Sequence, residues 1–428
     1  MTTGQRLERD LPMILDELAM SPYPDYIDIV LTVTARKRQR PRWTFFERWL
    51  PMTAVSSRAA LIPRTPLRIA GLVALLLIVL AMGAVLIVGS QRPLPAPFGP
   101  AANGHVAYAA NGDIYTADPA SGIAHAVITG PDTDLAPVWS RDGTHLAFER
   151  KAAGTGDLGR LYAARSDGRE LVAVTPDPLH GLGSYSFSPN GRAIVFAAGP
   201  TQARDLWIAN VDGSGVRRLE VGMPAFEPSY LPPNGAEIIF ASDVPADVAN
   251  GLYAVNVDTG IVRSIVAPAA GSGLDWVRAS PDGSRIAYSA GSFGSVANNY
   301  QIQVVTQDGA RNVTLPMPAG ATWEDAPFWS NDSTRLVVTR GYAAHNDDVV
   351  LAAVPADGRG VGVETAHGLT GCCDTTSEWA PDDRSILTTP EDMNGAPIQQ
   401  LLWDPSTGAT RPAPWPATSV PTWQRIAP

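Results

Sequence analysis

The chain has 428 residues, of which 45% are hydrophobic and 17% are charged, and its formal net charge is −10. This apolar share excludes a chain that is disordered throughout, and the length allows roughly two to three domains. The negative charge argues against nucleic acid as the main partner, because phosphate binding needs clustered cations. With 39 Gly and 38 Pro residues, the composition favours short elements joined by tight turns.

Residues 1–66 are expected to form a helical and juxtamembrane segment in the cytoplasm. Residues 6–20 place apolar side chains on one helical face, and residues 25–38 form a second candidate helix. Residues 36–68 mix aromatic rings with cations, which fits anchoring at lipid headgroups. Two short helices cannot bury a core by themselves, so residues 1–35 are expected to dock on something else.

A transmembrane helix is predicted at residues 67–90. Residues 69–88 contain no charged side chain, and such a run is long enough for a hydrocarbon core of about 30 Å. Residues 1–68 carry 11 Lys and Arg against 7 acidic residues. The positive-inside rule therefore places the amino terminus in the cytoplasm and the larger part of the chain outside. A cleaved signal peptide is the alternative, but the 68 residues before the apolar run favour a retained anchor.

A proline-rich linker at residues 91–102 precedes a repeat that fills residues 103–428. Each copy has five positions in order: an aromatic residue, a small residue, a proline or polar residue, an Asp or Asn, and a glycine. An alternating apolar run follows. The acidic or amide position recurs every 44–50 residues, at Asp142, Asn190, Asn234, Asp282, Asp332 and Asp382. A second Asp-Gly turn follows each copy, and Asp-Gly between apolar runs is typical of a β-hairpin.

Two hairpins per repeat give about four strands, which predicts the blades of an all-β propeller. The first outer strand, at residues 105–108, lacks the aromatic strand that should precede it, and residues 420–424 supply one. We therefore expect a seven-bladed β-propeller outside the membrane, with one blade split between the two ends of the repeat region. Six blades are the alternative, because the third copy is degenerate.

The repeat signature, clearest at residues 187–191 and 280–283, resembles that of TolB-like propellers, the WD40-like PD40 class. The resemblance covers residues 103–428. It implies an extracytoplasmic protein-binding platform or a propeller attached to a serine peptidase. The sequence contains no Gly-x-Ser-x-Gly motif, which argues against the peptidase.

The only two cysteines, Cys372 and Cys373, are adjacent. In an oxidising compartment they could pair with each other through a strained ring, or with another molecule. Three interpretations stay open: a structural vicinal disulfide, a redox-sensitive or ligand-stacking loop, and free thiols without a role. The polar loop at residues 345–348 is not expected to bind a metal, since consecutive residues rarely converge on one ion.

Tryptophan recurs at one repeat position, where packing between blades is expected: Trp139, Trp329, Trp379 and Trp423. Less periodic tryptophans are candidates for an exposed rim: Trp207, Trp276, Trp323 and Trp403. No spacing of carboxylates, or of a nucleophile and a base, points to catalysis. We therefore expect no catalytic residue, no metal, no cofactor and no enzymatic activity.

The expected function is that of a scaffold or sensor: a single-pass cell-membrane protein whose propeller binds an extracytoplasmic protein or polymer. The alternative is a transmembrane regulator similar in layout to anti-sigma factors, in which residues 1–35 hold a cytoplasmic regulatory protein. Residues 1–66 contain no His or Cys, unlike the zinc-binding anti-sigma factors. An enzyme that uses the propeller channel is the third and least favoured hypothesis.

Overall fold

The computed structural model describes residues 98–427, except 155–157, 176–178, 201–202, 245–248, 270–271, 293–298, 343–348, 367–375, 390–398 and 417–418. The predicted cytoplasmic segment, the predicted transmembrane helix and most of the linker lie outside these residues. A search of the described residues finds no helix with the length and apolar character needed to cross a membrane.

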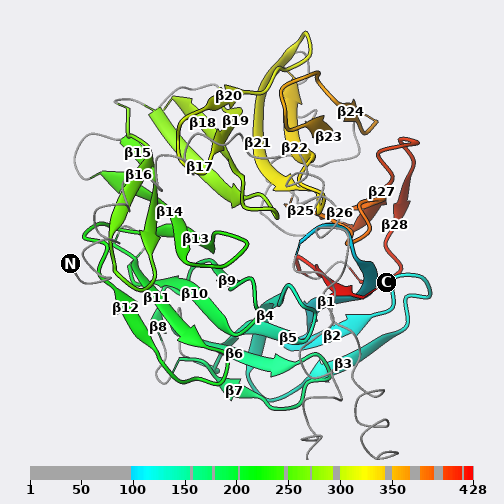
Figure 1. The fold of residues 1–428 in the computed structure, drawn as a ribbon. Coiled ribbons are helices and arrows are strands. Elements are labelled where there is room, and N and C mark those ends of the chain that lie inside the picture. The colour runs from blue at the N-terminus through cyan, green and yellow to red at the C-terminus, as the bar shows by residue number, and fades with distance from the viewer. Residues whose placement is uncertain are drawn as a thin grey trace, which may run out of the picture. The chain divides into compact units, whose positions relative to one another are not determined.

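The described strands form seven antiparallel sheets, the blades of a propeller (Figure 1). Blade 1 consists of β29 (Thr422–Ile426), β1 (Ala102–Ala110), β2 (Asp113–Ala117) and β3 (Ala124–Ile128). Blade 2 consists of β4 (Thr133–Trp139), β5 (His145–Lys151), β6 (Leu158–Arg165) and β7 (Val172–Ala173), with β8 (Leu179–His180) also paired to β6. Blade 3 consists of β9 (Tyr185–Phe187), β10 (Ala193–Ala198), β11 (Asp205–Asn210) and β12 (Arg217–Leu219).

The other four blades follow the same order along the chain. Blade 4 consists of β13 (Phe226–Tyr230), β14 (Glu237–Val244), β15 (Ala249–Asn256) and β16 (Val262–Val266). Blade 5 consists of β17 (Ser272–Ala279), β18 (Arg285–Ser292), β19 (Gln301–Thr306) and β20 (Asn312–Thr314). Blade 6 consists of β21 (Ala321–Trp329), β22 (Arg335–Tyr342), β23 (Val349–Pro355) and β24 (Val363–Glu364). Blade 7 consists of β25 (Thr376–Trp379), β26 (Ile386–Thr389), β27 (Leu401–Trp403) and β28 (Thr410–Pro412).

The split blade closes the ring. Strand β29 pairs antiparallel with β1, so that Trp423 lies opposite Val106 and Thr422 lies opposite Ala107. The pairing gives β1 a partner on the side that would otherwise be an open sheet edge. The predictions of seven blades and of a blade shared by two distant segments are confirmed.

The repeat signature forms the turn between the first and second strands of a blade. In blade 2 the Ser140 hydroxyl donates to Asp142 Oδ1 at 2.6 Å and accepts from the His145 backbone N–H at 2.9 Å. Gly143 adopts a φ of 68°, which a residue without a Cβ reaches at little cost. The same hydroxyl–carboxylate pair recurs in blades 5 and 6, so local hydrogen bonding explains why the signature is repeated.

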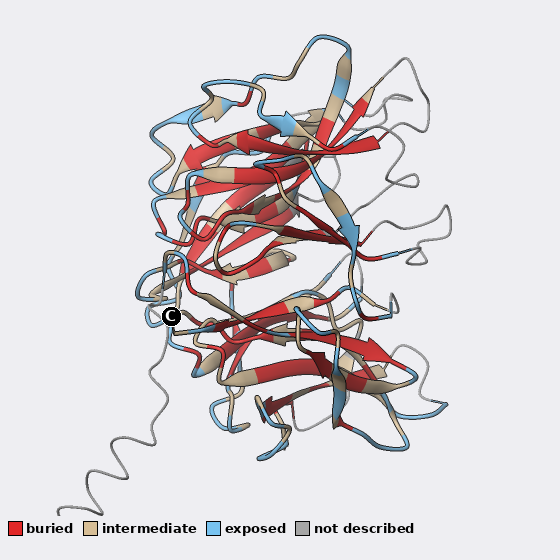
Figure 2. Cartoon of the chain, turned by 90° about the vertical axis from the view of Figure 1, so that its right-hand side faces the viewer, coloured by how far each residue is buried: buried red, intermediate tan, exposed pale blue. Residues whose placement is uncertain are grey.

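Side chains from neighbouring blades form the core between them (Figure 2). The four tryptophans at the repeat position are buried, as predicted, with exposed fractions of 3–9%. Each packs against residues of the preceding blade, as Trp423 does against Leu387 and Leu402. The prediction of an exposed rim is wrong for Trp403, which is fully buried in a cluster with Trp379 because β27 faces blade 6.

Polar side chains bridge three successive junctions between blades. Ser333 and Asp383 stand where the signature has glycine, and both keep a positive φ, near 60°. The Asp282 backbone N–H donates to Ser333 Oγ at 3.1 Å, and the Asn331 backbone N–H donates to Asp383 Oδ1 at 2.7 Å. Asn103 Oδ1 accepts from the Asp382 backbone N–H at 3.1 Å. The two departures from glycine therefore connect blades 5, 6 and 7, and Asn103 connects blade 7 to blade 1.

Candidate functional site

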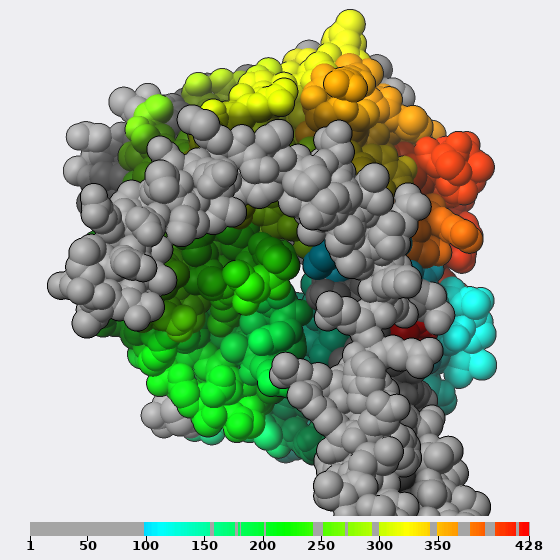
Figure 3. Space-filling view, in the orientation of Figure 1, coloured from blue at the N-terminus to red at the C-terminus, as the bar shows by residue number. Residues whose placement is uncertain are grey.

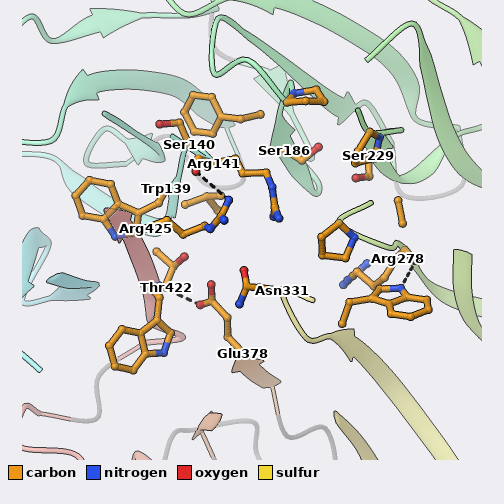
Figure 4. A pocket seen from close by; sticks show the side chains of 18 of the residues that line it. Trp139, Ser140, Arg141, Ser186, Ser229, Arg278, Asn331, Glu378, Thr422 and Arg425 are labelled. Atoms are coloured by element: carbon orange, nitrogen blue, oxygen red, sulfur yellow. Dashed lines mark hydrogen bonds between the residues drawn. The ribbon is translucent and has the colours of Figure 1, made fainter. Parts of the chain in front are cut away.

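The innermost strands of all seven blades line one cavity of about 310 Å³ at the centre of the ring. Figure 3 shows the hollow between the blades, and Figure 4 shows the lining side chains. All the innermost strands run in the same direction around this channel, so equivalent repeat positions lie at the same depth. Two positions of the repeat provide most of the lining.

The first position directly precedes the inter-blade residue, which is aromatic in every blade except blade 5, where it is Ala279. From blade 1 to blade 7 it is occupied by Thr422, Val138, Ser186, Ser229, Arg278, Phe328 and Glu378. The second position follows the inter-blade residue by two. From blade 1 to blade 7 it is occupied by Arg425, Arg141, Pro189, Pro232, Pro281, Asn331 and Pro381. Proline is the usual residue at the second position, so Arg141, Asn331 and Arg425 are departures that bring polar groups into the channel.

Arg141 and Arg425 come from adjacent blades and extend toward the same part of the channel (Figure 4). Arg425 is 6% exposed, and its Nη1 donates to the Arg141 carbonyl oxygen at 3.4 Å. Burial and then the positive charge of Arg425 lower the pKa of Arg141 to about 9. Burial lowers the pKa of Arg425 to about 10. Two cationic groups therefore share a poorly solvated site.

Asp383 is the acid whose charge acts on both arginines. Its carboxylate is already engaged, because it accepts hydrogen bonds from the backbone N–H and side-chain amide of Asn331 and from the Asp332 backbone N–H. Burial raises the pKa of Asp383. Asp383 therefore acts electrostatically on both guanidinium groups while its oxygens accept hydrogen bonds from blade 6.

Glu378 lies in the channel wall between blades 7 and 1 (Figure 4). The Trp423 backbone N–H donates to its Oε2 at 3.0 Å. Burial raises the pKa of Glu378 to about 8, although hydrogen bonds from Trp423 and Thr422 oppose the shift. At neutral pH the carboxyl group is therefore mostly protonated and can donate a hydrogen bond.

A side pocket of about 250 Å³ adjoins Glu378. It is lined by apolar side chains, including Leu387 and Val420, and by Ser377 and Thr389. These two residues are 3% and 0% exposed, and within the described part of the chain their hydroxyl groups have no hydrogen-bond partner. Buried hydroxyls without partners are costly, which marks this pocket as a place where a ligand could supply them.

Acidic residues gather where the innermost strands begin, away from the arginines. Burial, and then the charge of Glu227, raise the pKa of Asp275 to about 6, and Asp325 adds to the shift. Glu227 Oε2 accepts from the Val277 backbone N–H at 2.7 Å. Arg278 lies 3.5 Å from Glu227 and moderates the negative charge. A group of acidic residues therefore lies on the innermost strands of blades 4, 5 and 6, outside the lining of the cavity.

The sequence analysis did not identify these channel residues. Cys372, Cys373 and the polar loop at residues 345–348 lie outside the described residues. Among the residues that are described, no three His, Cys, Asp or Glu side chains are arranged to hold a metal ion. The available signal was the replacement of proline by Arg or Asn at one repeat position.

No protein-family model matches the sequence, and no curated protein is similar to it. Solved structures do match. The chain is 20% identical to TolB from Acinetobacter baumannii over 62% of this chain and 63% of that one, with a TM-score of 0.43. The match thus spans less than two thirds of that TolB. An oligogalacturonate lyase solved with manganese is 17% identical over 69% of this chain and 84% of its own, with a TM-score of 0.54.

A periplasmic gluconolactonase from Pseudomonas aeruginosa is 18% identical over 75% of this chain and 99% of its own, with a TM-score of 0.50. The expectation that the chain has no enzymatic activity must be corrected, because propellers similar to it include these two enzymes. At such low identities the matches show the fold alone, and the propeller fold does not exclude catalysis.

Proposed function

We propose that this chain is a binding propeller whose central channel is the recognition site. One observation carries the proposal: a single cavity gathers Arg141, Arg425, Asn331 and Glu378 from four different blades. Ligand sites are typically concave and mostly apolar, with a few convergent polar groups, and this cavity has that composition.

The surrounding ring favours recognition by a preformed site. Bridging contacts such as those of Ser333 and Asp383 join the blades that carry Arg278, Asn331 and Glu378. Burial of the tryptophans between the blades also restrains the strands that face the channel. A site held in place before binding loses less conformational entropy when a ligand arrives.

The test uses the full-length chain in detergent and a panel of organic acids, sugars, amino acids and short peptides. Four tryptophans line the cavity, so binding should change the intrinsic fluorescence. Ser229→Phe fills the channel, whereas Ser264→Phe makes the same change on the exposed side of outer strand β16. Binding that is lost only in Ser229→Phe supports the proposal. Equal binding by both variants would place the recognition site elsewhere.

We also propose that residues 67–90 anchor the propeller to the cell membrane with residues 1–66 in the cytoplasm. The uncharged run at residues 69–88 and the excess of basic residues before it support this arrangement. Protease added outside intact cells should digest the propeller and leave a fragment containing residues 1–66. Digestion of residues 1–66 under those conditions would contradict the proposed orientation.

A second candidate function is transmembrane regulation, supported by the two amphipathic stretches within residues 1–35. Cross-linking and affinity purification from native membranes can compare the full chain with a chain that lacks residues 1–35. A cytoplasmic transcription factor recovered only with the full chain would favour the regulator. The same extracytoplasmic partners recovered with both chains would favour the scaffold.

A further inference from the structure

We infer that the channel takes a small organic carboxylate, whose anionic group binds between Arg141 and Arg425. The inference rests on the proposed function, because it assumes that the channel is the recognition site, and it adds the chemical class of the ligand.

The two guanidinium groups occupy equivalent positions in neighbouring blades. Blades 3, 4, 5 and 7 have proline at this position, so the turn needs no cation there. A guanidinium group presents a planar set of N–H donors that matches the two oxygens of a carboxylate. Each guanidinium group has five N–H donors, so the two groups can bind one anion in addition to the partners that they already have.

The two neighbouring positive charges attract an anion. The Asp383 carboxylate is occupied by the Asn331 and Asp332 donors, so its charge serves the turn of blade 6 as well as the arginines. The lowered pKa of Arg141 reflects repulsion from Arg425 in addition to burial. A bound carboxylate would offset this repulsion, and in a poorly solvated site the attraction is screened less than at the surface.

The remaining lining limits the size and character of the rest of the ligand. A cavity of about 310 Å³ lies at the small end of the range for ligand pockets. Proline rings and aromatic side chains such as Phe187 and Phe328 form much of its wall. Beyond the arginines, the Ser186 and Ser229 hydroxyls and the Glu378 carboxyl offer uncharged hydrogen-bonding groups. A compact organic acid with hydroxyl or carbonyl groups fits this lining better than a long peptide does.

The experiment titrates the full-length chain in detergent with acetate, succinate and citrate, and with acetamide and succinamide as uncharged counterparts. Tryptophan fluorescence and thermal unfolding report binding. A short peptide with a free or an amidated carboxyl terminus tests whether a protein terminus could supply the same carboxylate. At least one free carboxylate should bind, and its amide counterpart should bind at least about tenfold more weakly, as expected for the loss of a charge-assisted hydrogen bond.

Variants assign the effect to the arginines. Arg141→Gln should weaken carboxylate binding by about tenfold or more, and Arg141→Lys should restore part of it by keeping the charge. Arg359→Gln removes the same charge from a side chain that is 88% exposed, and it should leave binding unchanged. Arg425 also donates to the Gly99 carbonyl, so its substitution would remove a structural hydrogen bond. The test therefore substitutes Arg141.

The outcomes separate this inference from the proposed function. If no carboxylate binds, or if Arg141→Gln binds carboxylate as well as Arg359→Gln does, the inference is wrong. If uncharged ligands of the wider panel still bind and Ser229→Phe abolishes their binding, the channel remains the recognition site. If no compound of either panel binds in the channel, both proposals fail.

Discussion

Replacing Glu378 by glutamine should stabilise the propeller by an amount that grows with pH. Burial raises the pKa of this carboxyl group from 4.5 to about 8, so the folded protein holds a proton that the unfolded chain releases. The contribution of that proton to stability is fully present below about pH 4.5 and is lost as the pH rises through about 8. Glutamine is neutral at every pH and can still accept from the Trp423 backbone N–H.

The size of the effect follows from the pKa difference. A difference of one in pKa corresponds to about 1.4 kcal/mol, so the upper bound near pH 8 is roughly 4–5 kcal/mol. Water that enters the channel will reduce this value, and we expect about 2–3 kcal/mol. At about pH 4.5 the variant and the natural chain should be nearly equal in stability.

Urea unfolding of the full-length chain, followed by tryptophan fluorescence, measures the difference at about pH 4.5, 6 and 8. Other acids with a raised pKa, such as Asp275, titrate in both proteins and cancel in the comparison. Glu220→Gln is the control, because the Glu220 side chain is 73% exposed. A stability difference between Glu378→Gln and the natural chain that does not grow with pH would refute the assignment of a poorly solvated, protonated carboxyl group.

Three further substitutions probe the ring by the same urea assay. Arg340→Leu should cost about 3–5 kcal/mol, because it leaves the fully buried Glu324 without its charged partner. Arg218→Leu, at an exposed ion pair, should cost much less, and similar losses would contradict the burial of the Arg340 pair. Trp423→Ala should cost about 3–5 kcal/mol, because it leaves a cavity between blades 1 and 7. A loss below about 1 kcal/mol would mean that β29 contributes little to ring closure. Asp383→Gly relieves the strain of a positive φ, but it also removes hydrogen bonds to blade 6. It should therefore cost about 1–3 kcal/mol. A stabilised variant would contradict the bridging role of Asp383.

The architecture could be predicted because each blade is specified by local chemistry. The turn formed by Ser140, Asp142 and Gly143 satisfies its own hydrogen bonds, so its signature survives in blade after blade. Ring closure could be predicted because the first repeat lacks the strand that should precede residue 105, and residues 420–424 match that strand. The pairing of Trp423 with Val106 confirms this prediction. Trp403 was misplaced because its burial depends on a neighbouring blade, and one sequence carries little information on that contact.

The candidate site could not be predicted by spacing along the chain. Arg141 and Arg425 are 284 residues apart, and only the closure of the ring places them together. Sequence reasoning looked for chemistry within short segments, whereas a propeller takes one residue from each blade. Comparing the channel-facing position across repeats would have revealed Arg141, Asn331 and Arg425 as departures from proline. Enzymatic activity was excluded for the same reason. The side chains that act together in a propeller channel come from different blades, so they form no motif along the chain.

The position of β29 also has a consequence for the kinetics of folding. The His105 backbone N–H donates to Gln424 Oε1 at 3.2 Å across 319 residues of sequence. Contacts of such high sequence separation form late and slow the folding of a domain. During synthesis β29 leaves the ribosome after every other strand described, so β1 waits with an unpaired edge while the rest of the ring assembles. Blade 1 is then the last blade to be completed, and this interval is when the chain is most exposed to pairing with another copy.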